Sequence, residues 1–230
     1  LAALRTTLAR RQPRVRLFEV GGCFAAEAGA YVQHERVAGL AYGSAMPEQW
    51  GAGARNVDFY DVKGDVEALF SSRKLNFEAA PHPASHPGRS ARILLDGQAI
   101  GWMGELHPQW QQQHDLPLPV VWFELELAPL MQTGLPKAQN ISRFPLVRRD
   151  LAVLVDENVT AQSLLDAMQA DKVPNVVELA LFDLYRGKGV GEGKKSLAFR
   201  VLLQDTQKTL TDIEIDQSML RLVATLERHG

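Results

Sequence analysis

The order of hydrophobic patterns between residues 151 and 228 constrains the fold more than any other feature of the chain. Five segments follow one another as strand, helix, strand, strand and helix: residues 151–155, 160–171, 176–185, 195–204 and 211–228. The third strand-like segment alternates strictly from Leu197 to Leu203, and the last helix begins at a capping box, Thr211 to Glu214. A β-α-β-β-α order needs one more strand to complete the ferredoxin-like βαββαβ pattern.

Residues 1–135 carry a different set of patterns and are expected to form a separate domain. Strands are predicted at 15–20, 36–42, 91–95, 98–106 and 120–127, and a helix at 61–70. Asp96-Gly97, between two of these strands, is a strong hairpin signal. The segment 131–141 lacks periodicity and contains a glycine and a proline, so it predicts a joint before a second domain at 139–230. We therefore expect an α+β protein whose first domain is a largely antiparallel sheet.

Composition excludes several classes of protein. At 230 residues and 46% apolar, the chain is long enough to bury a core, and no run approaches the roughly 18 consecutive apolar residues of a membrane helix. The single cysteine, Cys23, cannot form an internal disulfide, which favours a cytoplasmic location. Leu1, Leu4 and Leu8 have the spacing of the last turns of an amphipathic helix that starts in a longer protein. The net charge of −2 argues against a general polyanion binder, so a nucleic-acid site should be a local patch.

Basic residues gather in two stretches of the second domain. The segment 142–152 contains three arginines and one aromatic residue, with no acid before Asp150, and it leads directly into a predicted strand. A second group of lysines and arginines lies at 186–200, while most acids lie on or beside the predicted helices. In a βαββαβ fold both helices cover one face of the sheet, so we expect the cations on the uncovered face. An ordinary solvated surface is the alternative.

Three other features suggest chemistry, and each has a simpler interpretation. The segment 187–195 departs from a phosphate-binding loop because lysines stand at key positions and because it joins two strands, so it predicts a basic hairpin loop. His82, His86 and His107 have no carboxylate or thiol at ligand spacing, so we expect no zinc site. Cys23 is expected to be a small core residue, and the four tryptophans are expected in a core or an interface. No segment assembles an acid–base pair or a catalytic triad.

Short motifs run in one order along nearly the whole chain. In the first half they are Arg16-Leu-Phe-Glu-Val-Gly21, Asp58-Phe-Tyr-Asp-Val-Lys-Gly-Asp-Val-Glu67, His86-Pro-Gly-Arg-Ser-Ala91 and Gly101-Trp-Met-Gly-Glu-Leu-His-Pro108. In the second half they are Phe144-Pro145, Arg149-Asp-Leu-Ala152, Leu181-Phe-Asp-Leu-Tyr185, Lys195-Ser-Leu-Ala-Phe199 and Thr209-Leu-Thr-Asp212. With these motifs in this order and spacing, the chain resembles the C-terminal part of the β subunit of bacterial phenylalanyl-tRNA synthetase.

The resemblance implies a fold and a role for each half. Residues 1–135 would be a catalytic-like domain with the class II synthetase fold, and residues 139–230 a ferredoxin-fold anticodon-binding domain. Class II sites hold ATP with an arginine in an aromatic-Arg-x-acid motif, and Val15-Arg16-Leu17-Phe18 lacks both the aromatic and the acid, so no catalytic residue is expected here. The family's terminal strand is expected to be incomplete, because the chain ends at His229-Gly230, where that strand should begin.

The implied partners are the catalytic α subunit, in an α2β2 assembly, and tRNA(Phe), with no membrane. The β subunit would support the α subunit in the ATP-dependent attachment of phenylalanine to tRNA. ATP and magnesium would serve the holoenzyme, and neither a cofactor nor a metal is expected in this segment.

The second domain would hold the anticodon region of tRNA(Phe). The candidate tRNA-binding residues are Arg143, Phe144, Arg148, Arg149, Tyr185, Lys188, Lys194, Lys195 and Arg200. The cations would neutralise phosphates, and the aromatic rings would stack on unpaired bases. Phe144 has two open interpretations, a stacking ring or a core side chain.

Two other functions fit part of the sequence. A protein-interaction scaffold, which stabilises a partner subunit without binding RNA, fits the near-neutral charge and the tryptophan-rich first half. An independent RNA-recognition motif shares the βαββαβ order but needs two aromatic residues on the open face of its third strand. Here that strand is expected to place Ser196, Ala198, Arg200 and Leu202 outward and Phe199 inward, which disfavours this function.

Overall fold

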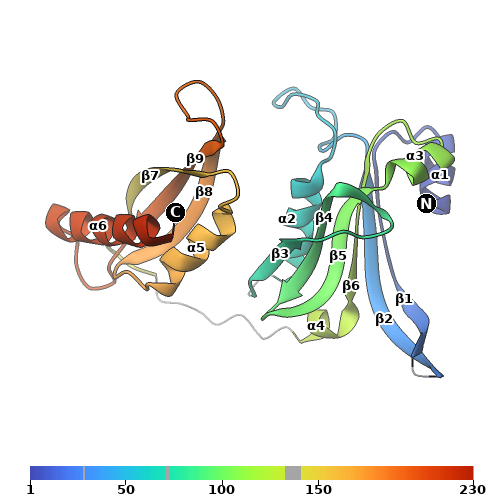
Figure 1. Ribbon diagram of the computed structural model, residues 1–230, viewed down its shortest axis with the longest axis horizontal. Coiled ribbons are helices and arrows are strands. Elements are labelled where there is room, and N and C mark those ends of the chain that lie inside the picture. The colour runs from blue at the N-terminus through green and yellow to red at the C-terminus, as the bar shows by residue number, and fades with distance from the viewer. Residues whose placement is uncertain (28, 71–72, 133–140, 230) are drawn as a thin grey trace. The chain divides into compact units, whose positions relative to one another are not determined.

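The computed structural model describes residues 1–229 except residues 28, 71–72 and 133–140, and it divides the chain into two compact units (Figure 1). Unit 1 comprises residues 1–137 and unit 2 residues 138–230. Each unit combines a sheet with helices, which confirms the predicted α+β class.

Unit 1 is built on a six-stranded antiparallel sheet with the strand order β1-β2-β6-β5-β4-β3. The strands are β1 (Val15–Glu27), β2 (Ala30–Tyr42), β3 (Leu75–Ala79), β4 (Ser85–Leu95), β5 (Gln98–Leu106) and β6 (Val120–Glu126). The β1–β2 ladder extends well beyond the two predicted segments, because backbone pairing continues through glycines and polar residues that interrupt the apolar alternation. The predicted hairpin at Asp96-Gly97 is confirmed, with φ of 51° and 81° at the two turn residues.

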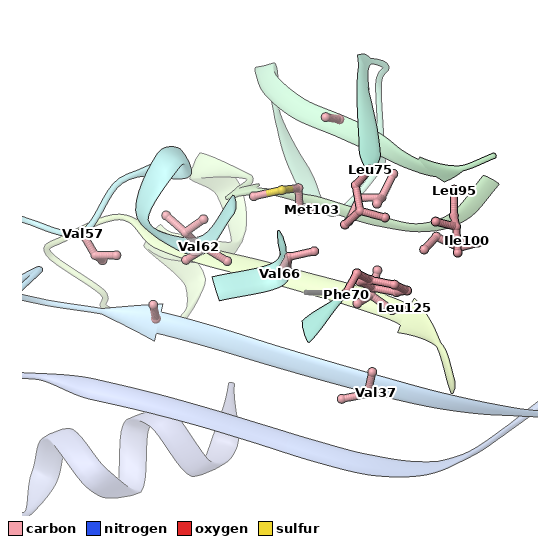
Figure 2. Close-up of a cluster of buried hydrophobic side chains, with 14 residues drawn as sticks. Val37, Val57, Val62, Val66, Phe70, Leu75, Leu95, Ile100, Met103 and Leu125 are labelled. Atoms are coloured by element: carbon pink, nitrogen blue, oxygen red, sulfur yellow. The ribbon is translucent and has the colours of Figure 1, made fainter. Parts of the chain in front are cut away.

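Helix α2 (Phe59–Leu69) covers one face of this sheet, as the pattern at 61–70 predicts. Figure 2 shows Val62 and Val66 of α2 among strand side chains that include Met103 and Leu125, and all four are at most 2% exposed. The helix begins at a capping box in which the side chain of Asp58 accepts from the backbone of Asp61 and the side chain of Asp61 accepts from the backbone of Asp58.

The opposite face of the sheet packs against a second apolar cluster. Three further helices complete the unit: α1 (Ala2–Ala9), α3 (Pro108–Gln113) and α4 (Leu127–Met131). Leu4 of α1 is fully buried against Val15, Tyr42 and Leu106.

Cys23 belongs to neither apolar cluster of unit 1. It lies exposed on β1, so the expectation of a core cysteine is wrong.

Unit 2 has a three-stranded antiparallel sheet with the order β7-β9-β8 and two helices. Its elements are β7 (Val147–Asp156), α5 (Ala161–Ala170), β8 (Val176–Tyr185), β9 (Lys194–Leu203) and α6 (Asp212–His229). The predicted β-α-β-β-α order is confirmed. No further strand follows α6 in the described part of the chain, so β7 is an edge strand.

Both helices of unit 2 lie on one face of its sheet, where they enclose the core (Figure 1). Leu197 and Phe199 of β9 are fully buried beneath Leu164 of α5 and Leu222 of α6. Helix α6 begins at the predicted capping box: the backbone N–H of Thr211 donates to the Glu214 carboxylate at 3.0 Å. No helix formed by the described residues of this unit covers the other face of the sheet.

Candidate nucleic-acid interface

The face of the unit 2 sheet opposite α5 and α6, here called the open face, carries alternate residues of each strand. On β9 these are Ser196, Ala198, Arg200 and Leu202, as predicted, because the residues between them are buried. Their partners on β7 are Leu154, Ala152, Asp150 and Arg148. Paired residues of neighbouring strands project to the same side. The open face therefore combines two arginines and one acid with small and apolar side chains.

Strand β8 contributes two aromatic residues to the open face, Phe182 and, beyond a β-bulge, Tyr185. Before the bulge Ala180 pairs with Arg200, and after it Asp183 pairs with Ala198, so the open-face residues change from even to odd numbers near Phe182. Phe182 is 49% exposed, and the Arg148 guanidinium lies 5.7 Å from the centre of its ring. Alternation from Ala180 already directs Phe182 to this face, whereas only the cross-strand register identifies Tyr185, which pairs with Ser196 after the bulge.

Three of the basic residues in the two stretches form ion pairs with nearby acids. Arg148 pairs with Asp150 at 2.9 Å, Arg200 with Glu178 at 2.5 Å and Arg186 with Glu157 at 2.5 Å. The hydrogen bonds that Arg148 donates to Asp150 raise the pKa of Arg148, and the hydrogen bonds that Arg186 donates to Glu157 lower the pKa of Glu157. These cations are held within the unit, so a phosphate would have to compete with a carboxylate for Arg148 or Arg200.

Lys195 is not an exposed cation. It is 7% exposed and pairs with Val155, on the side of the sheet that the helices cover. Its ammonium donates to the carbonyl oxygen of Glu157 at 2.6 Å, which satisfies one of its hydrogens inside the unit. The expectation that Lys195 contacts phosphate therefore finds no support in its position.

The loop before β7 is tied to the end of β9. The Ser142 hydroxyl donates to the carbonyl of Asp205 at 2.7 Å, and the Gln204 side chain donates to the carbonyl of Phe144 at 2.7 Å. Phe144 is half-buried, whereas Arg143 and Arg149 are exposed and form no ion pair with any described residue. Arg149 pairs with Val201 and so projects from the helix side of the edge strand, unlike Arg148.

The β8–β9 hairpin carries the remaining candidates. The Tyr185 hydroxyl donates to the carbonyl of Lys188 at 3.3 Å, and its ring lies so close to Gly187 that an added Cβ would meet the hydroxyl at 2.8 Å. Tyr185 is 49% exposed, and Lys188 and Lys194 are exposed without an ion pair to any residue that the structure describes. The residues between β8 and β9 form the basic hairpin loop that the sequence predicts at 187–195.

The exposed cations form two groups at opposite ends of the sheet. Arg149 lies near the start of β7, and Asp156 at its end pairs with Lys194. At about 3.3 Å per residue, the seven-residue separation of Arg149 and Asp156 spans about 23 Å. Between them lie Phe182, Leu154 and the ion-paired Arg200 of the open face. The expected gathering of cations on the uncovered face is therefore not continuous, because Arg148 and Arg200 are ion-paired there and Arg149 projects to the helix side.

The histidines of unit 1 have structural partners. The Nδ1 atoms of His82, His86 and His107 accept hydrogen bonds from the backbone N–H groups of Ala84, Gly88 and Gln109, at 3.1–3.2 Å. Among the described residues no group of three His, Cys, Asp or Glu side chains could hold a metal ion. Trp50 is fully exposed, which excludes the core alternative for this tryptophan and leaves the interface alternative as a prediction.

Comparison with protein families assigns both units. Residues 1–127 match the family described as "Phenylalanyl tRNA synthetase beta chain CLM domain", and residues 142–230 match the "Ferredoxin-fold anticodon binding domain". The chain belongs to the phenylalanyl-tRNA synthetase β-chain family. The resemblance drawn from the sequence motifs is thereby confirmed.

Several β subunits of phenylalanine–tRNA ligase are similar to the chain over nearly all its length. Those of Nitrosospira multiformis and Dechloromonas aromatica are 52% and 51% identical over 99% of the chain, and that of Neisseria gonorrhoeae is 43% identical over 99%. The chain spans 29% of the length of each of these relatives. A pyrrolysyl tRNA synthetase from Desulfitobacterium hafniense overlaps 57% of this chain and 47% of its own at 12% identity, with a TM-score of 0.38, too low to support an argument. No helix in the described part of this β-chain segment is long and apolar enough to cross a membrane.

Proposed function

We propose that unit 2 binds the anticodon region of tRNA(Phe), as part of a phenylalanine–tRNA ligase. The anticodon-binding family of residues 142–230 supports this proposal, and the observation that carries it is the exposed Phe182 ring on a sheet face without helices. An aromatic ring on a sheet can stack on a splayed base, which is how many single-stranded RNA sites work. Arg143 and Arg149 at one end, and Lys188 and Lys194 at the other, would contact phosphates.

Unit 1 is proposed to be a non-catalytic domain that supports the catalytic α subunit in an α2β2 assembly in the cytoplasm. Arg16, the arginine nearest to the class II ATP-binding motif, is engaged by Asp65 of α2 at 2.8 Å. The proposal therefore assigns ATP and magnesium to the holoenzyme's catalytic subunit and no cofactor to this segment.

The salt dependence of binding tests how many phosphates are contacted. With four contacts at about 0.7 each, log affinity should fall against log salt with a slope of about −3. Replacing Arg143 and Arg149 together by alanine should reduce the slope to about −1.4, because two contacts remain. Titration of labelled tRNA(Phe) at several salt concentrations measures both slopes. The matched control is Arg5→Ala with Arg10→Ala, which removes two exposed cations of α1 and should leave the slope unchanged. Equal slopes for the two double variants would reject the cation assignment.

Removal of the Phe182 ring tests the stacking role. Phe182→Ala should weaken tRNA(Phe) binding by about 1–3 kcal/mol, the usual value of one stacked base, with no change in the salt slope. Filter binding measures the loss. Phe18→Ala is the control, since that ring is 80% exposed on unit 1 and is not expected to contact the anticodon. Undiminished binding by Phe182→Ala would contradict a base contact on the open face.

A scaffold without RNA contact is the second candidate, and exposed aromatic residues on the β1–β2 hairpin favour it. Phe18, Phe24 and Tyr31 are 72–86% exposed on one side of this hairpin. Exposed apolar groups gathered on one surface are typical of a protein-interaction site. This function predicts stable association with the α subunit, measured by sedimentation, together with no detectable affinity for tRNA(Phe).

A further inference from the structure

Unit 1 contains a hollow of about 500 Å³ on the sheet face that α1 partly covers. This volume lies within the range of small-molecule pockets, about 300–1,000 Å³. Aromatic and aliphatic side chains line most of it, and two carboxylates, Glu19 and Glu124, are among its polar groups. The hollow lies within one unit, and its floor is formed by β1, β2 and β6, at one side of the six-stranded sheet.

Two cross-strand rows form the floor of the hollow. In the first row Glu19 pairs with Ala38, and Ala38 pairs with Glu124. Since paired residues project to the same side, the two carboxylates stand on either side of the short Ala38 side chain, with backbones about 10 Å apart. In the adjacent row Leu40 pairs with Trp122. The floor therefore places an apolar strip directly beside a gap between two acids.

The two carboxylates of the hollow differ in their ion pairing. Glu124 forms an ion pair with Arg36, which compensates one carboxylate. Glu19 forms no ion pair with any described residue, and no lysine or arginine is among the lining residues. The site therefore holds one carboxylate without an ion pair beside an apolar surface.

His82 completes one wall without adding a positive charge. Its ring lies between those of Trp102 and Trp122, with 5.1 Å between ring centres in each case. Burial lowers the pKa of His82, so the ring is neutral at pH 7. Its Nδ1 accepts from the backbone of Ala84, which leaves the ring proton on Nε2. The wall is thus aromatic and uncharged.

We propose that the hollow binds a small organic cation, with its ammonium group above Ala38 between Glu19 and Glu124, and its apolar body against Leu40 and Trp122. The uncompensated carboxylate selects a positive charge, and the aromatic wall selects an apolar, preferably aromatic, body. Binding of a cation in this hollow does not require either unit to bind tRNA.

Ligand binding in the hollow can be measured through the indole signals of the four tryptophans of the chain. Trp102 and Trp122 line the hollow, whereas Trp50 and Trp110 do not, so ¹⁵N-indole NMR signals divide into two reporters and two internal controls. Titration with 2-phenylethylamine should shift the Trp102 and Trp122 signals saturably. The uncharged 2-phenylethanol should bind at least about fivefold more weakly. Equal affinities for the two probes, parallel shifts of all four signals, or no saturable shift would overturn the proposal.

Substitution of the free carboxylate gives an independent arm. Glu19→Gln should weaken amine binding about fivefold and leave alcohol binding unchanged, because it removes the charge but keeps the shape. The matched control is Glu126→Gln, two residues beyond Glu124 on the same face of β6 and outside the hollow. Amine affinities that are equal for Glu19→Gln, Glu126→Gln and the unsubstituted protein would overturn the proposal. The comparison of amine with alcohol in the unsubstituted protein decides the question even if a variant folds poorly.

Discussion

At the scale of single residues, immediate neighbours decide what each cation does. Arg148 and Arg149 are adjacent in sequence, yet Arg148 lies over Phe182 and pairs with Asp150, while Arg149 projects to the opposite side without an ion pair to a described residue. Alternation along a strand separates their directions, and the register of neighbouring strands supplies their partners. Residue type alone therefore does not identify a phosphate contact.

Two glycines with nearly the same backbone conformation offer a matched test of close packing. Gly43 and Gly97 have φ of 82° and 81°, but a Cβ on Gly43 would meet the Pro13 carbonyl oxygen at 2.0 Å, while one on Gly97 meets nothing within 4 Å. Gly97→Ala should cost about 1 kcal/mol of unfolding free energy, from the left-handed conformation alone. Gly43→Ala should cost about 3 kcal/mol because backbone must also move. Urea unfolding followed by tryptophan fluorescence gives both values, and equal losses would contradict the clash.

The acid stability of unit 1 should depend on Arg55. Hydrogen bonds from the Arg55 guanidinium lower the pKa of Asp61 from 3.8 to about 2. Because the folded-state pKa is the lower one, this stabilisation is complete above about pH 4 and is lost as the pH falls towards 2. Arg55→Gln should therefore lower the stability at pH 7, and the difference from the unsubstituted protein should shrink between pH 4 and pH 2. Urea unfolding at pH 7, 4 and 3 measures this, and a difference that is independent of pH would argue against the linkage.

At the scale of elements, helix ends and strand edges explain where the predicted segments begin. Helix α6 starts where its capping box satisfies backbone groups, so its first residue follows from the sequence alone. Strand β7 begins four residues earlier than the apolar run at Leu151, because Val147 already pairs with Leu203. The length of a strand depends on how far its partner strand continues, and the strand's own residues do not encode that.

Loss of the α6 cap should loosen that helix locally. Thr211→Ala removes the hydroxyl that accepts from the backbone of Glu214 and should cost about 1 kcal/mol. Thr211→Ser keeps the hydroxyl and should cost little. Hydrogen exchange measured by mass spectrometry should show faster exchange in the first turn of α6 for the alanine variant only. Equal exchange in both variants would show that packing of Ile215 and Leu222, rather than the cap, holds this end.

At the scale of the whole molecule, each unit has a core of its own. The clusters around Val66 and Leu4 belong to unit 1, and the cluster around Phe199 belongs to unit 2. All four tryptophans lie in unit 1, so tryptophan fluorescence follows that unit alone. A separate core is what allows a domain to unfold as its own cooperative step.

Core truncation in unit 2 should separate the two unfolding transitions. Phe199→Ala, at a fully buried position, should cost about 3–5 kcal/mol of unfolding free energy in unit 2. Circular dichroism should then show an early transition, while the tryptophan transition stays in place. Phe70→Ala, in the core of unit 1, is the converse variant and should move the tryptophan transition. A tryptophan transition that moves equally in both variants would show that the cores unfold together.

The sequence by itself determined the type and order of most elements of this β-chain segment, all five of unit 2 among them, but it did not predict the short elements β3, α3 and α4. Alternation from Leu197 to Leu203, the hairpin at Asp96-Gly97 and the capping box at Thr211 are local patterns, because strand periodicity, turn geometry and helix capping act within a few residues. The family also followed from the sequence, since its motifs are short and ordered. The candidate nucleic-acid interface could not be predicted from the sequence in this way, because its residues come together from different strands.

Only the tertiary structure decided which side chains are available. The carbonyl that holds Lys195 comes from a loop and the acid that pairs with Arg200 comes from the neighbouring strand β8, where a bulge also turns Tyr185 toward the open face. The gap between Glu19 and Glu124 likewise exists only because three strands align in register. Charge and apolarity are properties of a residue, whereas exposure, pairing and the depth of a pocket depend on what the fold places beside it.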